Sequence, residues 1–209
     1  ADLVFADPPY NVKIDGHVSG NGAKKYGEFA MASGEMSEEE FVAFLTKAFE
    51  LLATNLVPGA VSYCAMDWRH MGEILAASRA VNWDYLNLCV WVKANGGMGS
   101  FYRSRHELVF VFRNGSAPHV NNVQLGRFGR NRQNVWNYPG ANSFRRKGHA
   151  DSLDLHPTVK PVALVADVIL ASTNRRAIVL APFAGSGTPF TARGRPGRPG
   201  RGRRGRERR

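Results

Sequence analysis

The chain has 209 residues, of which 44% are hydrophobic, so it is long enough to bury one sizeable core. It contains no run of eighteen apolar residues, which argues against a membrane-spanning helix, and its first residues lack the pattern of a signal peptide. The formal net charge of +11 is unevenly distributed. Residues 189–209 hold nine arginines and one glutamate, which leaves 19 basic and 16 acidic residues for the remaining 188. The body of the protein is therefore only mildly basic.

The first half of the chain alternates strand and helix patterns. Residues 1–6 predict a buried strand that ends at the two prolines of 7–10, and residues 11–34 predict a long loop. Ser37 and Glu40 have the spacing of a capping box at the start of a helix that Pro58-Gly59 ends. The apolar face expected for this helix comprises Phe41, Phe44, Leu45, Ala48, Leu51 and Leu52. A strand over 60–65, a helix over 68–79 capped by Asp67, and strands over 85–92 and 107–112 follow.

The last elements repeat the alternation. Pro161 can open a helix, and a strand over 177–180 leads into the glycine-rich segment 183–188. Strands that alternate with helices predict an α/β sheet with helices on both faces. Cys64 and Cys89 lie in apolar stretches and are expected to be reduced, buried thiols of a cytoplasmic protein. The helix after Pro161 has an expected apolar face of Val162, Val165, Ala166, Ile169 and Leu170.

Region 93–150 mixes glycines and asparagines with cations and aromatic rings. One interpretation is an irregular surface insertion with solvated charges. The other is a nucleic-acid surface, because cations bind phosphates while aromatic rings stack on bases. The cations include Lys93, Arg103, Arg105, Arg127, Arg130, Arg132, Arg145, Arg146 and Lys147, and the rings include Phe101, Tyr102, Phe128, Trp136 and Tyr138.

Asp7-Pro8-Pro9-Tyr10 ends the first strand, where ligands bind in open α/β sheets. An exocyclic base amine is a poor nucleophile because its lone pair is delocalised into the ring. An acceptor for the amine hydrogens favours the tetrahedral geometry of attack, and Asp7 and the Pro8 carbonyl supply acceptors. Tyr10 offers a face on which a flipped base can stack. A simple strand-ending turn is the alternative interpretation.

Phe183-x-Gly185-x-Gly187 follows the last predicted strand. Its glycines allow the backbone to approach a ligand closely, although a plain glycine-rich turn has the same composition. Taken together and in this order, the two motifs resemble the DNA methylases that act on the exocyclic amines of adenine or cytosine, in the permuted class with D-P-P-Y before the cofactor loop. His156-Pro157-Thr158-Val159-Lys160-Pro161, Trp91-Val92-Lys93 and Asn134-Val135-Trp136 also fit that family.

The resemblance implies a Rossmann-like methyltransferase domain over 1–188, with S-adenosylmethionine as cofactor, double-stranded DNA as partner and a recognition region at about 93–150. D-P-P-Y is the more frequent motif in enzymes that act on adenine, which favours adenine over cytosine. The histidines lack metal-ligand spacing, so no metal is assigned. Asp7, Pro8, Pro9 and Tyr10 are the expected base-binding residues. The residues expected to surround the cofactor are Phe183, Ala184, Gly185, Ser186, Gly187, His156 and Lys160, with a turn residue as the alternative for His156. Arg103, Arg105, Arg127, Arg130 and Arg132 are the expected DNA contacts.

The sequence departs from the family pattern at its end. Ala181 stands where relatives carry an aspartate, and an Arg/Gly/Pro-rich tail over 189–209 replaces a helix and a strand. The tail is expected to be disordered, either as a basic arm that binds phosphates or as the product of a frameshift in a GC-rich gene. The start at a strand suggests that the chain is truncated before Ala1. Two further hypotheses remain open, a DNA-binding remnant without catalysis and a methyltransferase for RNA amines or protein amides.

If the tail is a phosphate-binding arm, its deletion weakens DNA binding similarly for all sequences and flattens the salt dependence of the dissociation constant. Measuring that constant across a range of salt concentrations for the full chain and for residues 1–188 tests this. Identical salt slopes would exclude the arm.

Overall fold

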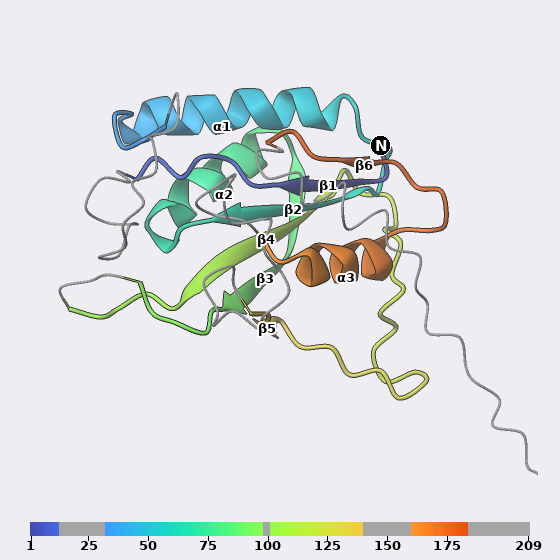
Figure 1. The fold of residues 1–209 in the computed structure, drawn as a ribbon. Coiled ribbons are helices and arrows are strands. Elements are labelled where there is room, and N and C mark those ends of the chain that lie inside the picture. The colour runs from blue at the N-terminus through green and yellow to red at the C-terminus, as the bar shows by residue number, and fades with distance from the viewer. Residues whose placement is uncertain (13–31, 98–100, 140–159, 184–209) are drawn as a thin grey trace, which may run out of the picture.

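The structure is a computed structural model that describes residues 1–12, 32–97, 101–139 and 160–183. A six-stranded mixed sheet lies between helices on both of its faces (Figure 1), as the sequence predicts. In chain order the elements are β1 (Leu3–Ala6), α1 (Glu38–Ala53), β2 (Val61–Met66), the 3-10 turn η1 (Trp68–His70), α2 (Met71–Ala80), β3 (Trp83–Val92), β4 (His106–Asn114), β5 (Val135–Asn137), α3 (Val162–Ser172) and β6 (Val179–Leu180).

The direction of the strands determines which residues meet at the edge of the sheet. The spatial order is β5-β3-β4-β2-β1-β6. β1 runs parallel to β2 and β6, and β3 runs parallel to β5, whereas β4 is antiparallel to both of its neighbours. The carboxyl ends of five strands and the amino end of β4 therefore lie along one edge of the sheet, called the carboxyl edge below.

Side chains alternate between the two faces of the sheet, because successive residues of a strand point to opposite sides. In β1, Val4 and Ala6 belong to the core under α1 and α2, whereas Leu3 and Phe5 belong to the core under α3. Odd-numbered residues of β2 and β4, and those of β3 beyond its bulge at Tyr85 and Asn87, share the α3 side with Leu3 and Phe5. These are Val61, Tyr63, Cys89, Trp91, Val109 and Val111.

Helix α1 begins at the predicted capping box. The Ser37 hydroxyl accepts a hydrogen bond from the Glu40 backbone N–H at 3.2 Å, and the Glu40 carboxylate accepts one from the Ser37 N–H at 2.8 Å. The predicted apolar face is correct except at Leu51, which is 59% exposed, while Phe49 is fully buried. Leu51 lies about 100° around the helix from buried Leu52, outside the stripe that faces the sheet. The helix ends at Ala53, before Pro58-Gly59.

Helix α3 begins directly after Pro161, where a helix was expected, but it has a different buried face. Leu164 and Val168 are buried, whereas Leu170, predicted to be buried, is 53% exposed. The helix is apolar on almost every side, with Asp167 as its one charged residue, so its periodicity does not determine which side faces the sheet. Only the packing on β1 selects the buried residues.

Three elements differ in form from the sequence predictions. The helix expected over 68–79 begins as η1, whose cap is the predicted Asp67, and continues as α2. Strand β6 is confined to two residues, Val179 and Leu180. Strand β5 was not predicted as a strand, because three residues are too few to show a two-residue period.

Two of the leucines of α1 provide a test of the packing. Leu45→Ala removes a fully buried side chain and is expected to lower the free energy of unfolding by about 2–5 kcal/mol. Leu51→Ala makes the same chemical change on the exposed side and is expected to cost less than about 0.5 kcal/mol. Urea denaturation of both variants measures the difference, and equal losses would contradict the observed orientation of α1.

Candidate functional site

Alternation along three strands brings ionisable side chains to one place on the carboxyl edge. Asp7 follows β1, Lys93 follows β3, and Glu107 is the second residue of β4. All three continue the odd-numbered positions that face α3. Because β4 runs opposite to its neighbours, its beginning, with Glu107, lies beside the end of β3 and pairs with Trp91. The sheet thus aligns three charged groups that are far apart in sequence.

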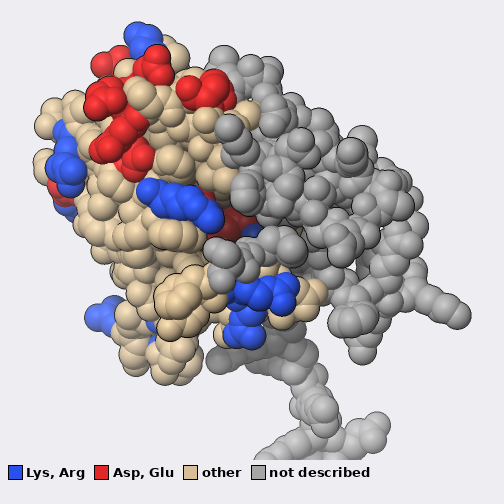
Figure 2. Space-filling view, turned by 90° about the vertical axis from the view of Figure 1, so that its left-hand side faces the viewer, with Lys and Arg blue, Asp and Glu red and all other residues tan. Residues whose placement is uncertain are grey.

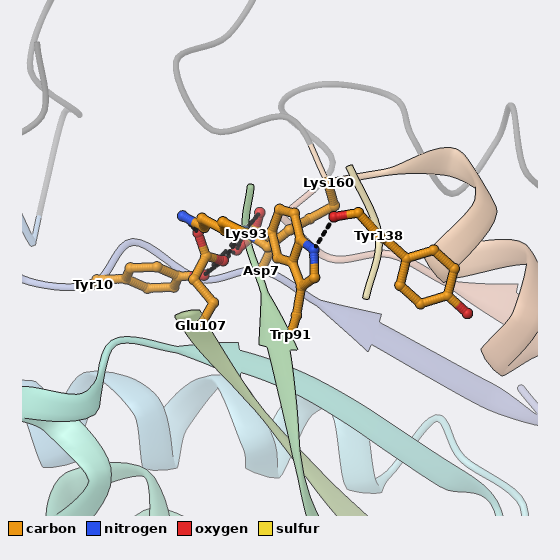
Figure 3. A network of polar contacts seen from close by, with 7 residues as sticks. All are labelled: Asp7, Tyr10, Trp91, Lys93, Glu107, Tyr138 and Lys160. Atoms are coloured by element: carbon orange, nitrogen blue, oxygen red, sulfur yellow. Dashed lines mark hydrogen bonds and ion pairs between the residues drawn. The ribbon is translucent and has the colours of Figure 1, made fainter. Parts of the chain in front are cut away.

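Lys160, two residues before α3, joins these groups from above the sheet (Figure 3). Its ammonium group donates to both carboxylate oxygens of Asp7, at 2.7 Å and 2.8 Å. It also lies 3.0 Å from Glu107 Oε2 and donates to the Tyr10 hydroxyl at 3.0 Å. The Lys160 side chain is only 3% exposed, so these contacts replace its hydration.

Glu107 forms the second half of the cluster. Its Oε2 faces Lys160, and its Oε1 forms an ion pair with Lys93. The Tyr10 hydroxyl contacts both carboxylates, Asp7 Oδ1 at 2.9 Å and Glu107 Oε2 at 3.1 Å. Tyr10 therefore bridges the two acids, as Figure 3 shows. The five residues Asp7, Tyr10, Lys93, Glu107 and Lys160 are called the edge cluster below.

The charges of the edge cluster compensate each other, with two carboxylates and two ammonium groups. Burial by itself would raise the pKa of Glu107, but the ammonium groups of Lys160 and Lys93 outweigh it and lower this pKa to about 2. Burial would lower the pKa of Lys160, but Asp7 and Glu107 outweigh it, so that this pKa is raised. Burial and the two carboxylates together raise the pKa of Tyr10 well above its usual value. Glu107 and Lys160 are therefore ionised at neutral pH, and the phenol is neutral.

The edge cluster is connected to the end of the predicted recognition region. Lys93 Nζ lies 5.2 Å from the centre of the Trp91 ring, and Trp91 Nε1 donates to the Tyr138 carbonyl at 2.9 Å. The Tyr138 hydroxyl in turn donates to Asp167 of α3. These contacts hold β5 and the residue after it against α3.

Phe183 lies beyond β6, on the other side of the sheet. Its ring packs against the core under α1, with its centre 6.4 Å from that of Phe44. β6 pairs with β1, and the helix between β1 and β2 covers one face while the helix before β6 covers the other. When the helices connected to two neighbouring strands lie on opposite faces of an open α/β sheet, ligands generally bind at the carboxyl ends of those strands.

The family model described as DNA methylase matches residues 1–198. The chain belongs to the DNA methylase family. Among curated proteins it is similar to the type II methyltransferase M2.MboI of Moraxella bovis, with 27% identity over 200 residues. That match covers 90% of this chain and 69% of the relative.

Solved structures of DNA methylases have the same fold. The PvuII DNA methyltransferase, described as cytosine-N4-specific, is similar with a TM-score of 0.68 and 14% identity over 91% of this chain and 70% of that chain. TTHA0409 of Thermus thermophilus, described as a putative DNA modification methylase complexed with S-adenosyl-L-methionine, gives a TM-score of 0.54 and 20% identity over 91% of this chain and 74% of that chain. The Rossmann-like fold expected from the sequence is thus confirmed.

In this DNA methylase the structure places Asp7, Tyr10 and Lys160 together. The expected place of Lys160 beside the cofactor stays a prediction. Pro8 and Pro9 lie between the two cluster residues of the D-P-P-Y motif. Phe183 lies apart from this cluster, on the α1 side of the sheet. His156, Ala184, Gly185, Ser186 and Gly187 lie outside the described residues.

The five arginines expected to contact DNA do not form one group. Arg103 and Arg105 are exposed on the β3–β4 connection at the carboxyl edge, where Arg103 donates to the Gly97 carbonyl. Arg127 and Arg130 belong to the β4–β5 connection, which contacts the far end of α3 through Asn122. Arg132 lies on the side of α3, 3.3 Å from Asp167.

The sequence did not identify Glu107 as a site residue, and it gave Lys93 only as one of many cations and as part of a segment that fits the family. The available signal was a carboxylate at the beginning of an otherwise apolar strand, where burial requires a partner. The sequence did not show that β4 is reversed, and therefore did not show which edge Glu107 occupies. Within the described ranges, no cluster of three or more acidic, His or Cys side chains is arranged for a metal ion. No helix in those ranges is long and apolar enough to cross a membrane.

The low pKa of Glu107 predicts an acid-dependent loss of stability. The pKa falls from its ordinary value of 4.5 to about 2 on folding, so ionised Glu107 stabilises the folded state above about pH 4.5 and this contribution disappears as the pH approaches 2. We expect the wild type to lose stability relative to Glu107→Gln over that interval. Urea denaturation of both proteins at several pH values measures this, and a pH-independent difference would contradict the assignment.

Proposed function

We propose that this DNA methylase transfers a methyl group from S-adenosylmethionine to the exocyclic amine of a flipped adenine in double-stranded DNA. The observation that carries the proposal is the position of the Asp7 carboxylate. It follows the buried strand β1, begins the D-P-P-Y motif, and is held by Lys160 and Tyr10 while 20% of its side chain stays exposed. An orientated and accessible acceptor suits a substrate that presents N–H groups.

Asp7 performs the chemistry required of an amine-methylating site. Its carboxylate accepts a hydrogen bond from the base amine and directs the nitrogen lone pair away from the ring, towards the incoming methyl group. The nitrogen would form a bond to the methyl carbon as the bond from that carbon to sulfur breaks, which leaves a neutral thioether. The proton that is hydrogen-bonded to Asp7 passes to that carboxylate. Holding the amine in this geometry reduces the entropic cost of attack.

The carboxyl ends of β1 and β6 are the proposed place of the cofactor. Phe183, which is partly exposed, follows β6, and β6 pairs with the strand that precedes Asp7. We assign Phe183 and the segment 184–187 to cofactor binding. S-adenosylmethionine supplies a methyl group made electrophilic by its positively charged sulfur. In this proposal the base binds at the end of β1 and the cofactor binds at the end of the neighbouring strand β6.

DNA is proposed to approach the carboxyl edge from the side of the β3–β4 connection. Phe101 and Tyr102 are 86% and 83% exposed, with ring centres 4.3 Å apart, and Arg103 and Arg105 follow them. Figure 2, which faces this edge, shows acidic side chains gathered at the top, over the start of α1, and basic ones below them. A polyanion is repelled from the acidic first turn of α1 and attracted to the region below it.

One observation favours a second candidate, a DNA-binding protein without catalysis. Ala181 directly follows β6, at the position where the family pattern has an aspartate, and it cannot accept a hydrogen bond from a cofactor through its side chain. The choice of adenine rests on the aspartate of D-P-P-Y, and cytosine is the alternative base. Both questions are answered by one assay.

That assay measures the transfer of a labelled methyl group from S-adenosylmethionine into mixed-sequence DNA, followed by digestion to nucleosides. We expect label in methyladenine. Asp7→Ala is expected to reduce transfer by about 100-fold or more while DNA affinity stays nearly unchanged. Asp7→Asn keeps a carbonyl acceptor and is expected to lose less.

The matched control is Asp84→Asn, which removes an ion-paired aspartate at the other end of β3 and should leave transfer unchanged. Label in methylcytosine would replace adenine by cytosine in the proposal. DNA binding without any transfer by the wild type would support the non-catalytic candidate.

A further inference from the structure

Lys160 faces more acceptors than it has protons to donate. Four oxygen atoms lie within 3.0 Å of its Nζ, two from Asp7, one from Glu107 and one from Tyr10. An ammonium group has three N–H donors. The bonds of Lys160 are therefore divided between the two carboxylates, and neither carboxylate pairs with Lys160 exclusively.

Asp7 consequently keeps part of its capacity to accept hydrogen bonds. Described residues donate two hydrogen bonds to its Oδ1 and one to its Oδ2. An ionised carboxylate has about four lone-pair positions. Its side chain is 20% exposed, compared with 8% for Glu107, so the remaining position can be approached from outside the protein on Asp7 more readily than on Glu107.

We propose, on the basis of the function proposed above, that Glu107 is a positioning residue for methyl transfer, which shares Lys160 with Asp7 and so preserves an Asp7 oxygen for the base amine. Glu107 does not touch the reacting atoms in this proposal. It acts through Lys160, and its second oxygen is bound by Lys93. The positive charge of Lys93 compensates part of the negative charge of Glu107. Glu107 therefore attracts the Lys160 ammonium group, but Lys160 keeps its hydrogen bonds to Asp7.

Glu107→Gln shows what the carboxylate contributes. The amide keeps the shape of the side chain but carries no negative charge, and the cluster then holds one carboxylate against two ammonium groups. Charge-assisted hydrogen bonds are about twice as strong as neutral ones, so Lys160 pairs mainly with Asp7. The incoming amine must then compete with an ammonium group for the same oxygens.

A purely structural role for Glu107 leads to a different expectation. Buried charge clusters stabilise or destabilise a fold without any influence on a reaction step. In that case Glu107→Gln changes the free energy of unfolding and leaves kcat of the folded protein unchanged. A second substitution in the cluster then adds damage and does not restore activity.

The experiment compares methyl transfer by the full-length chain and its variants on the same mixed-sequence DNA. We expect Glu107→Gln to lower kcat at least ten-fold, with the DNA dissociation constant within two-fold of wild type. Glu107→Asp keeps the charge but retracts it by one methylene group, and we expect an intermediate kcat. This variant decides the matter if Glu107→Gln does not fold, because a kcat equal to wild type would overturn the proposal.

The double variant Glu107→Gln/Lys160→Met gives the sharpest readout. It removes the competing ammonium group and restores the charge balance, and we expect kcat to recover at least three-fold over Glu107→Gln alone. Glu73→Gln is the matched control, because Glu73 is also buried and paired, with His70 at 2.6 Å on the neighbouring turn. It should keep wild-type kcat.

The outcomes separate the two proposals. An active wild type with an unaffected Glu107→Gln, or a double variant slower than the single one, overturns the role of Glu107 and leaves the methyltransferase proposal intact. A wild type that transfers no methyl group overturns both.

Discussion

The sharing of one buried ammonium group by two carboxylates is the constraint on which the site depends. Lys160, Asp7 and Glu107 come from three segments that only the folded sheet brings together. Each charge would be costly to bury alone, and their mutual compensation makes the arrangement tolerable. The same compensation fixes geometry, because Lys160 contacts both carboxylates and a shift of any of the three changes the contacts of another. A site that must hold a weak nucleophile in one orientation benefits from such rigidity.

The topology of the sheet makes this arrangement possible. Had β4 run parallel to β2, its first residues would lie at the opposite edge, and Glu107 would be far from Asp7. The reversal of a single strand therefore adds an acid to an edge that otherwise receives only the ends of strands. It also places Lys93 next to Glu107, since β3 ends where β4 begins.

Much of the fold follows from local signals in the sequence. The capping box at Ser37, the prolines after β1 and the alternation of strands with helices predict elements whose physical causes lie within a few residues. The buried face of α3 was not predictable in this way, because its residues are apolar all round and only contact with β1 selects among them. The exposure of Leu51 was not predictable either, because this residue is apolar but lies outside the face of α1 that packs on the sheet.

The residues of the candidate site also differ in whether a local motif predicts them. Asp7 and Tyr10 could be identified from a motif, and Lys160 from its place in a recognisable segment. Glu107 could not, because its importance arises from the direction of β4 and from charged partners that lie far from it in the chain. Long-range electrostatics leave no short pattern in a sequence.

The position of β1 between β2 and β6 has a consequence for how the protein acquires its structure. β1 is made before its partners, yet one of its edges pairs with β6 at residues 179 and 180, and Asp7 meets Lys160 across 153 residues. During synthesis the most buried strand of the sheet therefore stays half-paired until nearly all of the described chain has emerged. Folds dominated by such distant contacts form slowly, and their unpaired strand edges are prone to aggregation. Efficient folding of this methylase thus depends on protecting β1 during that interval.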